Sequence, residues 1–346
     1  MSRVITFFEA KDWEKEEYLR RLKEKLGERF QDFEVKFVSY TLNKETCREH
    51  GDTEIAVIYL NSVVDEEVLD QMKNLKFVIT RTTGMDHIDI LACKRRGIEV
   101  ANVPVYASVT VAEHAIALMF ALARRLKTAI SKMKDFDFSR EGLMGFDLFG
   151  KVAGVIGTGN IGSHICRIAF GIGMEVLAYD LNPNKKLEEL YKVKYVSLDQ
   201  LLASSDVIFV AVPLTKETKH LINLENIKLV KDKAMLINIA RGPVVDTSAL
   251  LWALANGKLK GGVALDVFEG EKVLTEGSFL KEVCPPEVLT KALQTLYLFR
   301  YPNFILTPHV AYYSEEAMER LMHSVVAEIS HYLLYKLSSI TYGEYF

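Results

Sequence analysis

The chain has 346 residues, more than the length at which a single hydrophobic core keeps growing, so we expect two domains. Its hydrophobic fraction of 49% is sufficient for well-filled cores. The 43 basic and 46 acidic residues leave a net charge of −3, which argues against nucleic acid or an anionic membrane as a partner. No secretory-signal pattern opens the chain, and its longest apolar run, 115–123, is too short to span a bilayer. We therefore expect a cytoplasmic protein.

The cysteines, at positions 47, 93, 166 and 284, form no C-x-x-C pair and no zinc-ligand spacing. We expect reduced thiols and no metal site.

The first hundred residues alternate apolar strands with amphipathic helical stretches. This alternation predicts a parallel sheet covered on both faces. After one of these strands, Thr83 and Gly84 could offer backbone amides to an anion, although an ordinary turn explains this stretch better when it is taken alone. The strands are predicted at 4–8, 33–38, 55–59, 77–80 and 99–101.

A long, mostly apolar helix is predicted at 109–125, and it should connect two domains and be buried between domains or subunits. His114 within it is expected to be a half-buried, hydrogen-bonded histidine. The following segment, 127–150, has no clear periodicity and should wrap over a surface.

A glycine motif at 157–162 organises the central part of the chain. An apolar strand at 152–156 runs into Gly157, Gly159 and Gly162, and a helix pattern follows, which is G-x-G-x-x-G in the setting of a dinucleotide site. Gly157 would permit the tight turn, Gly159 would let backbone amides approach a pyrophosphate, and Gly162 would let the helix lie close to the strand. The phosphates would sit at the helix N-terminus, where free N–H groups and the dipole favour anions.

Asp180 ends the next strand, 23 residues after Gly157 (157 to 180), near the offset of the acid that binds the adenosine ribose. Its carboxylate would accept bonds from the hydroxyls of NAD and repel the 2′-phosphate of NADP. Lys185 and Lys186 leave NADP as an alternative, but solvated loop charges explain them better.

Strands and helices continue to alternate up to a strand at 304–306, and a final amphipathic helix at 315–334 should return to the first domain. Pro213, Arg241 and Asp266 each follow a predicted strand. Ligands bind at the carboxyl ends of strands in open α/β sheets, so these residues should converge on one crevice. Between Asp266 and His309 the segment 268–302 reads as an irregular loop with one helix at 287–296.

Arg241, Glu271 and His309 together could support hydride transfer to NAD from a secondary alcohol. A histidine suits proton exchange with the hydroxyl near neutral pH, and a carboxylate on its far nitrogen would orient it and favour its protonated form. An arginine would grip a substrate carboxylate in two-pronged fashion. Singly, each residue also fits an ordinary role: Arg241 a surface charge, Glu271 part of a solvated loop, His309 a turn residue.

Seven stretches closely resemble the NAD-dependent D-2-hydroxyacid dehydrogenases, and the likeness covers most of residues 75–330. Their order and spacing make the resemblance specific. They are NVPVY at 102–106, VAEH at 111–114, GTGNIG at 157–162, VPLTKET at 212–218, NIARGPVVD at 238–246, ALDVFEGE at 264–271 and TPHVAYY at 307–313.

The resemblance implies that Arg241, Glu271 and His309 form the catalytic set, with Glu271 rather than Glu269 as the carboxylate. It implies NAD as the cofactor and a small 2-ketoacid or 2-hydroxyacid as the substrate. The implied NAD contacts are Gly157, Gly159, Asn160, Ile161, Gly162, Asp180, Val212, Pro213, Thr218, Ile239, Ala240, Arg241 and Asp266. The implied substrate contacts are Thr83, Gly84, Tyr106, Arg241, His309 and Tyr312.

The implied fold is α/β with two doubly wound parallel-sheet domains, in which a Rossmann NAD-binding domain is inserted into a flavodoxin-like substrate domain. We place the substrate domain at 1–103, the NAD-binding domain at 104–309, and the returning helix at 310–346. A homodimer built on the nucleotide domain is also implied.

His309 lies 38 positions after Glu271 (271 to 309), a spacing that resembles the D-lactate branch of this family more than its phosphoglycerate and glycerate branches. We therefore expect a D-lactate dehydrogenase. D-glycerate, D-3-phosphoglycerate and branched 2-ketoacid substrates remain alternatives. An NAD-sensing corepressor is a further alternative, against which the absence of long disordered tails argues.

Overall fold

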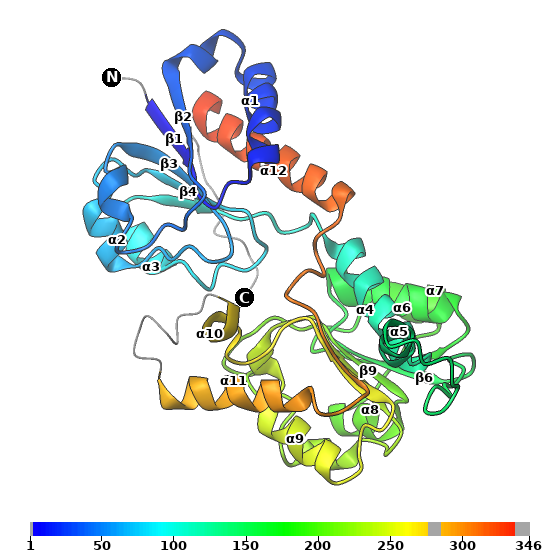
Figure 1. Cartoon of the computed structure of the whole chain (residues 1–346). Coiled ribbons are helices and arrows are strands. Elements are labelled where there is room, and N and C mark those ends of the chain that lie inside the picture. Colours follow the sequence, from blue (N-terminus) through cyan, green and yellow to red (C-terminus); the bar gives the residue numbers. More distant parts are fainter. Residues whose placement is uncertain (1–2, 276–284, 336–346) are drawn as a thin grey trace. The chain divides into compact units, whose positions relative to one another are not determined.

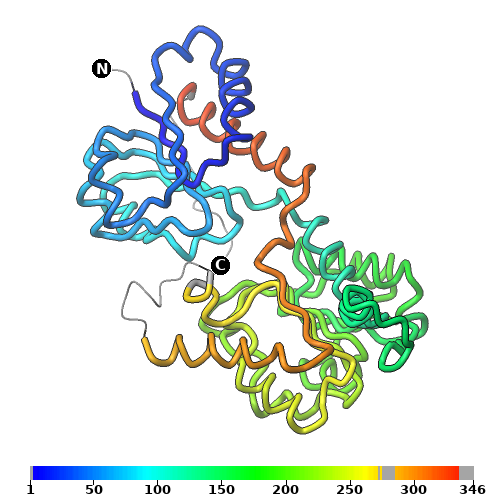
Figure 2. The backbone as a smooth tube through the Cα atoms, viewed as in Figure 1, coloured from blue at the N-terminus to red at the C-terminus, as the bar shows by residue number. Residues whose placement is uncertain are grey.

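The computed structural model describes residues 3–275 and 285–335. Packing divides the chain into two compact units: a terminal unit, Met1–Tyr106 with Ser314–Phe346, and a central unit, Ala107–Tyr313. Figure 2 lets the reader follow the chain out of the terminal unit and back into it. The sequence led us to expect domain boundaries after residues 103 and 309. Those boundaries separate a substrate domain from a cofactor domain, and they stay a prediction.

The terminal unit is built on a five-stranded parallel sheet in the order β2-β1-β3-β4-β5, an order typical of flavodoxin-like folds. Helices α1 and α12 pack together in this unit (Figure 1). The strands are β1 (Arg3–Phe7), β2 (Phe33–Phe37), β3 (Thr53–Ile58), β4 (Phe77–Thr80) and β5 (Glu99–Ala101). The α-helices are α1 (Asp12–Leu26), α2 (Glu66–Gln71), α3 (Ile90–Arg95) and α12 (Glu315–Tyr335).

A buried arginine anchors the loop that follows β4. Arg81 is fully buried, and its Nη1 lies 2.9 Å from a carboxylate oxygen of Glu14 on α1. Its Nη2 donates to the carbonyl oxygens of Phe8 and Glu9, and its guanidinium lies over the ring of Tyr59. A buried charge without partners would be strongly unfavourable, so these contacts fix the start of the 82–84 loop.

The central unit contains a seven-stranded parallel sheet in the order β12-β11-β10-β9-β6-β7-β8. This is the Rossmann order extended by one strand. The strands are β6 (Val152–Ile156), β7 (Glu175–Tyr179), β8 (Lys194–Tyr195), β9 (Val207–Val210), β10 (Met235–Asn238), β11 (Gly262–Leu265) and β12 (Phe304–Leu306). Its α-helices are α4 (Ser108–Ala123), α5 (Leu126–Lys134), α6 (Asn160–Gly171), α7 (Lys185–Tyr191), α8 (Leu198–Ser204), α9 (Thr247–Ala255), α10 (Glu271–Thr275) and α11 (Pro286–Leu298). The α/β fold with two parallel sheets is therefore confirmed.

Six of the seven strands of the central sheet end level with one another. Because each strand pairs in register with its neighbour, the residues that follow these ends share one edge of the sheet. The paired end residues are Tyr179, Ile156, Val210, Asn238, Leu265 and Leu306.

The apolar sequence of helix α4 is explained by burial, because the helix packs against α6, β10 and β11 inside the central unit. Two local interpretations of the sequence were wrong. Residues 126–134 form helix α5 rather than irregular chain, and Lys185 and Lys186 begin helix α7 rather than standing in a loop, although both remain exposed. The first of these is visible as the short helix beside α4 in Figure 1. Short amphipathic helices are easily missed because one or two turns show little periodicity.

Three described cysteines, Cys47, Cys93 and Cys166, are buried free thiols. Burial raises the pKa of Cys93 to about 11 and that of Cys166 to about 12, so these thiols stay protonated. Cys284 lies outside the described residues. No helix in the described part of the chain is long and apolar enough to cross a membrane.

Candidate functional site

The glycine loop after β6 has the shape that a dinucleotide needs. Gly157 has φ +90°, and a Cβ there would lie 2.7 Å from the carbonyl oxygen of Ala211. A Cβ on Gly162 would lie 1.9 Å from the carbonyl oxygen of Gly157, so the helix and the loop touch through bare backbone. At Gly159, the N-cap of α6, an added Cβ would meet no atom within 4 Å. The loop therefore leaves open space in front of the N-terminus of α6, a helix of 12 residues. This space fits a pyrophosphate, which the free N–H groups of the helix would bind.

Asp180 stands one residue past the end of β7, and its carboxylate is tied to the glycine loop. One oxygen accepts the backbone N–H of Thr158 at 2.6 Å and the Thr158 hydroxyl at 3.0 Å. The other oxygen accepts the N–H of Asn182 at 2.8 Å. Tyr195 on β8 donates to the Thr158 hydroxyl, which completes the bracing. These bonds hold an anionic group beside the loop, where it suits ribose hydroxyls and opposes a phosphate.

The other residues expected at the cofactor lie at or near the same edge of the sheet. Asn160 and Ile161 are the first residues after the N-cap of α6, and Val212 and Pro213 follow β9. The Thr218 hydroxyl donates to the carbonyl oxygen of Pro213 at 2.6 Å and accepts the N–H of Thr215 at 2.7 Å, so it closes this loop. Ile239 and Ala240 are buried directly after β10. Their contacts with a cofactor stay predictions.

His309 and Glu271 are joined as the sequence led us to expect. The distance from His309 Nδ1 to Glu271 Oε1 is 2.8 Å, and both side chains are about three-quarters buried, with 24% and 23% exposed. This bond leaves the Nε2 side of the ring for other partners. The ring of Tyr312 meets the His309 ring edge-on, with centroids 6.2 Å apart.

The turn that carries His309 is held by Asp266, which follows β11 and is 1% exposed. Its carboxylate accepts the Thr307 hydroxyl at 2.6 Å and the backbone N–H groups of Val310 at 3.0 Å and Ala311 at 2.9 Å. The His309 amide donates to the Asp266 carbonyl oxygen at 2.9 Å. This turn places His309 at φ +54°, a conformation that non-glycine residues rarely adopt. Asp266 thus has a structural role beside its predicted contact with the cofactor.

Arg241 follows the end of β10. Its Nη1 donates to the carbonyl oxygen of Ala240 at 2.9 Å, and its own carbonyl accepts the side-chain amide of Asn238. A Cβ on the next residue, Gly242, would lie 2.3 Å from the carbonyl oxygen of Phe268. The backbone of the Arg241 loop therefore packs directly on the segment that leads to Glu271.

The terminal unit contains the remaining predicted substrate contacts. Thr83 is exposed in the loop after β4, where its hydroxyl donates to the carbonyl oxygen of Val103. The Thr82 hydroxyl donates to the carbonyl oxygen of Gly84, which fixes the bend of the loop. Tyr106 is 6% exposed, and its carbonyl accepts Nε of Arg320 on α12 at 2.7 Å. The roles of Thr83, Gly84 and Tyr106 toward a substrate stay predictions.

Several residues that shape the site were not predicted from the sequence. Thr158 and Tyr195 brace Asp180, and Thr307 links Asp266 to His114, whose Nε2 lies 3.3 Å from the Thr307 hydroxyl. His114 is 24% exposed in its side chain, so its expected half-buried, hydrogen-bonded state is confirmed. Thr158 and Thr307 lie inside quoted motifs and could have been identified there. Tyr195 has no local signal.

Comparisons with known proteins agree with this geometry. Residues 116–311 match the family model described as the D-isomer specific 2-hydroxyacid dehydrogenase, NAD binding domain. The D-lactate dehydrogenase of Escherichia coli strain K12 is 34% identical over 328 residues, which cover 94% of this chain and 95% of that protein.

Solved structures show the same similarity over nearly the whole chain. A D-lactate dehydrogenase from Aquifex aeolicus, solved with NAD and lactic acid, has a TM-score of 0.84 and 37% identity, with 95% of both chains covered. A D-2-hydroxyisocaproate dehydrogenase has a TM-score of 0.80 and 28% identity, with 97% of this chain and 98% of that chain covered.

The position of Asp180 predicts selectivity for NADH over NADPH. Asp180→Asn keeps an oxygen for Thr158 but removes the charge, so we expect the ratio of kcat/KM for NADH to that for NADPH to fall about tenfold or more. Like charges ~4 Å apart repel by about 1 kcal/mol in water and by several times more near a protein surface. Asp199→Asn, an exposed acid on α8, is the matched control and should leave the ratio unchanged. Equal rates of the unaltered enzyme with both cofactors would contradict the assignment.

Proposed function

The chain belongs to the D-isomer-specific 2-hydroxyacid dehydrogenases, and from that membership we propose that it reduces pyruvate to D-lactate. NAD is the cofactor of this family and of this chain, and in its reduced form it supplies the hydride. The observation that carries the proposal is the 2.8 Å hydrogen bond from His309 to Glu271, placed past the carboxyl ends of the strands. Relatives and structural neighbours named D-lactate dehydrogenases support the choice of substrate.

His309 is the acid that donates a proton to the substrate's keto oxygen during reduction. Its Nδ1 is engaged by Glu271, so the proton comes from Nε2. The Glu271 carboxylate orients the ring and stabilises the imidazolium by its opposite charge. In the oxidative direction the same nitrogen accepts the hydroxyl proton.

Arg241 binds the substrate carboxylate, because a planar guanidinium can present two N–H groups to two carboxylate oxygens. The amides of Thr83 and Gly84 are proposed as further carboxylate donors. Tyr106 and Tyr312 supply aromatic surface that suits a methyl or modest apolar side chain.

A small, unphosphorylated substrate fits the charges near the site. The segments 82–85, 103–108 and 310–313 contain no lysine or arginine that could bind a phosphate. Arg320 does reach the backbone of Tyr106, so exclusion of phosphorylated substrates needs a direct test.

A panel of ketoacids tests the substrate. We expect the highest kcat/KM with pyruvate, followed by 2-ketobutyrate, because one methylene changes specificity by only about 1–3 kcal/mol. The panel comprises pyruvate, 2-ketobutyrate, hydroxypyruvate, 2-ketoisocaproate, phenylpyruvate and 3-phosphohydroxypyruvate, followed by NADH absorbance, with the chirality of the product assayed. A phosphorylated best substrate or an L product would overturn the proposal.

The catalytic roles predict three different kinetic signatures. His309→Ala should lower kcat by about 10²-fold or more, since it removes the general acid. Arg241→Lys should chiefly raise the KM for pyruvate, because a point charge replaces a planar fork. Glu271→Gln should make pyruvate reduction fail at a lower pH than in the unaltered enzyme, because the imidazolium loses its anionic partner. Superimposable pH profiles of the Glu271→Gln and unaltered enzymes would mean that Glu271 has been misassigned.

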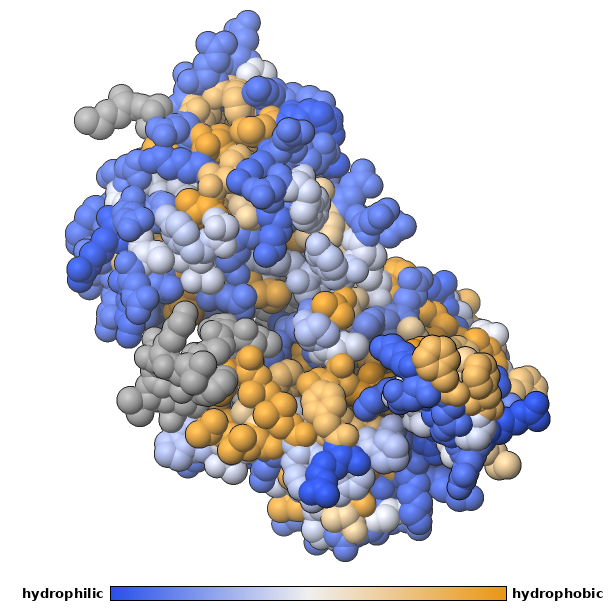
Figure 3. Space-filling view, viewed as in Figure 1, coloured by the Kyte–Doolittle hydropathy of each residue, from blue (hydrophilic) through white to orange (hydrophobic). Residues whose placement is uncertain are grey.

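We also propose that the protein is a homodimer, with α5 and the chain after it as part of the interface. The central unit exposes large apolar side chains there, and Figure 3 shows hydrophobic atoms gathered over α5. Patches of this kind on a folded protein mark interaction surfaces. The exposed fractions are 57% for Ile130, 50% for Met133, 82% for Phe136, 75% for Phe138, 90% for Met144 and 81% for Phe149.

The dimer proposal predicts a change of mass on polar substitution of this surface. In sedimentation velocity at micromolar concentration, the unaltered protein should be a dimer, and the double variant Phe138→Ser/Met144→Ser should be largely monomeric. Leu190→Ser is the control, because Leu190 on α7 is a 62% exposed leucine outside this surface. A stable monomer of the unaltered protein, or a double variant that stays dimeric, would refute the assignment of the interface.

A further inference from the structure

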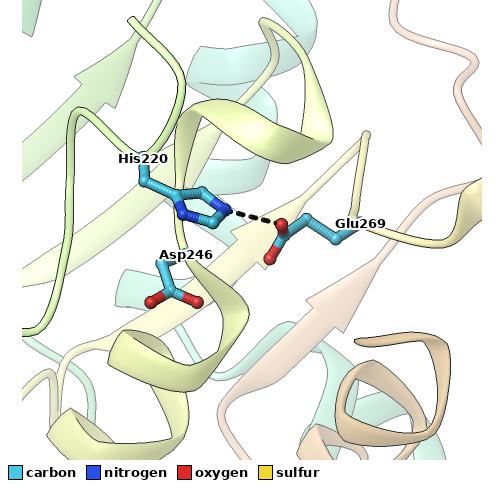
Figure 4. A group of neighbouring side chains, drawn as sticks. All are labelled: His220, Asp246 and Glu269. Atoms are coloured by element: carbon cyan, nitrogen blue, oxygen red, sulfur yellow. Dashed lines mark hydrogen bonds and ion pairs between the residues drawn. The ribbon is translucent and has the colours of Figure 1, made fainter. Parts of the chain in front are cut away.

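A second acid, Glu269, stands two residues before Glu271 and is 8% exposed. One of its carboxylate oxygens lies 2.8 Å from Nε2 of His220, and the other accepts the backbone N–H of Thr247, the first residue of α9, at 2.8 Å. Figure 4 shows the His220 ring and the Glu269 carboxylate facing each other, with Asp246 close to both. The proposed reaction uses none of these side chains.

Lys291 on α11 ties this cluster together. Its Nζ bonds the carboxylate of Asp246, donates to the hydroxyl of Ser248 at 2.9 Å, and lies 3.5 Å from Oε2 of Glu269. Asp246 also caps α9 by accepting the Ser248 amide. Although burial opposes it, the Lys291 ammonium and this amide hold the pKa of Asp246 below its usual range. One cation therefore links the start of α9 to the loop that precedes Glu271.

The geometry argues against a metal ion at this place. His220, Asp246 and Glu269 offer three ligand atoms within 4.8 Å of one another, which could suit a divalent cation. However, the Lys291 ammonium already contacts both carboxylates, and a metal would have to displace it. Lys291 thus serves as the cation of the cluster.

Helix α11 also contacts the backbone of the same loop. Gly270, between Glu269 and Glu271, has φ +81°, and a Cβ there would lie 2.8 Å from the Cβ of Ala292. Ala292 is fully buried and follows Lys291 directly. The amides of Val273 and Leu274 donate to the Gly270 carbonyl, so this backbone also begins α10 with Glu271. Two adjacent residues of α11 thus contact this loop: Lys291 pairs with the side chain of Glu269, and Ala292 packs against the backbone of Gly270.

We propose that Lys291, acting through Glu269, is a positioning residue that aims Glu271 at Nδ1 of His309. The inference rests on the proposed function, because it gives α11 a part in holding that acid–base pair. The hydrogen bond between Glu271 and His309 joins two side chains that are each about three-quarters buried. A loop released at Glu269 would lengthen it.

The pH profile distinguishes positioning from a simple effect of charge. Removing the positive charge of Lys291 would by itself stabilise the imidazolium of His309, so pyruvate reduction would extend to higher pH. If Glu271 instead moves away from His309, the imidazolium loses its partner and reduction fails at lower pH. The two effects have opposite signs.

The test compares Lys291→Met, Lys291→Arg and the control Lys258→Met. Lys258 pairs with Asp232 at 3.0 Å and is 26% exposed, against 24% for Lys291. We expect Lys291→Met to lower kcat about tenfold, as misplacement of a reacting group does, and to move the alkaline limit of the profile to lower pH. Lys291→Arg should restore part of both, and Lys258→Met should change neither. An unchanged limit, or one moved to higher pH, with Lys291→Met overturns the inference.

A readout without substrate or cofactor supports the same comparison. A proton held between His309 Nδ1 and Glu271 should give a far-downfield proton NMR signal, assigned by its loss in Glu271→Gln. We expect Lys291→Met to broaden or remove this signal while the circular dichroism stays native. Glu269→Gln, which keeps the side-chain volume, should act similarly and serves if Lys291→Met is unstable. Retention of a sharp signal in the folded variants overturns the inference.

The double variant Lys291→Met/Glu271→Gln distinguishes failure of the positioning role of Lys291 from failure of the proposed acid–base role of Glu271. If Lys291 acts through Glu271, the double variant should show the pH limit of Glu271→Gln alone, because coupled residues are not additive. Additive shifts would overturn the positioning role. If Glu271→Gln by itself leaves the profile unchanged, the proposed function fails first, and the inference falls with it.

Discussion

The proposed chemistry depends on the turn that carries His309. Three hydrogen bonds to the buried carboxylate of Asp266 hold this turn in place. They fold the chain after β12 so that His309 adopts a left-handed backbone conformation. Such a conformation costs about 1–3 kcal/mol in a non-glycine residue. Hydrogen bonds to a charged group contribute about 1.5–3 kcal/mol each. Three of them outweigh the strain, so the position of the histidine depends on Asp266, the residue that follows the neighbouring strand β11.

Parallel pairing explains why groups from distant parts of the sequence share one edge. The central strands end level, so the glycine loop, Asp180, Arg241 and the Asp266 loop all start from one row of residues. Two glycines then let neighbouring backbones touch: Gly162 packs on the backbone of Gly157, and Gly242 packs on that of Phe268. The division of labour follows from this row: β6 and β7 lead to the cofactor motif, and β10, β11 and β12 lead to the proposed catalytic residues.

In each unit, one buried or largely buried cation is placed against several acceptors. Arg81 in the terminal unit bonds Glu14 and two carbonyl oxygens next to the 82–84 loop. Lys291 in the central unit bonds Asp246 and Ser248 and pairs with Glu269 next to Glu271. Such pairs add little net stability, but their geometry is demanding. Both lie beside loops to which we assign contacts with the substrate or with the acid–base pair.

Much of this protein could be predicted from its sequence because the signals are local. The predicted strand bounds at 77–80 and 99–101 were correct. Short apolar runs bounded by turn residues show directly where a strand begins and ends. The glycine motif, Asp180 at its offset and the pairing of Glu271 with His309 were visible as spacing and resemblance. Short helices such as α5 and α10 were missed, because so few turns carry little periodicity.

The tertiary structure alone decided what depends on distance in space. Nothing near Lys291 in the sequence shows that its ammonium meets Asp246, 45 residues away. Nor does the sequence around Asp266 reveal that its carboxylate binds the turn of His309 rather than solvent. The sequence by itself determined the two parallel sheets, the cofactor motif and the residue types of the site, because periodicity and spacing are properties of neighbours. Which side chains support those residues was decided by packing, because a partner is chosen only when separate strands and helices are brought together.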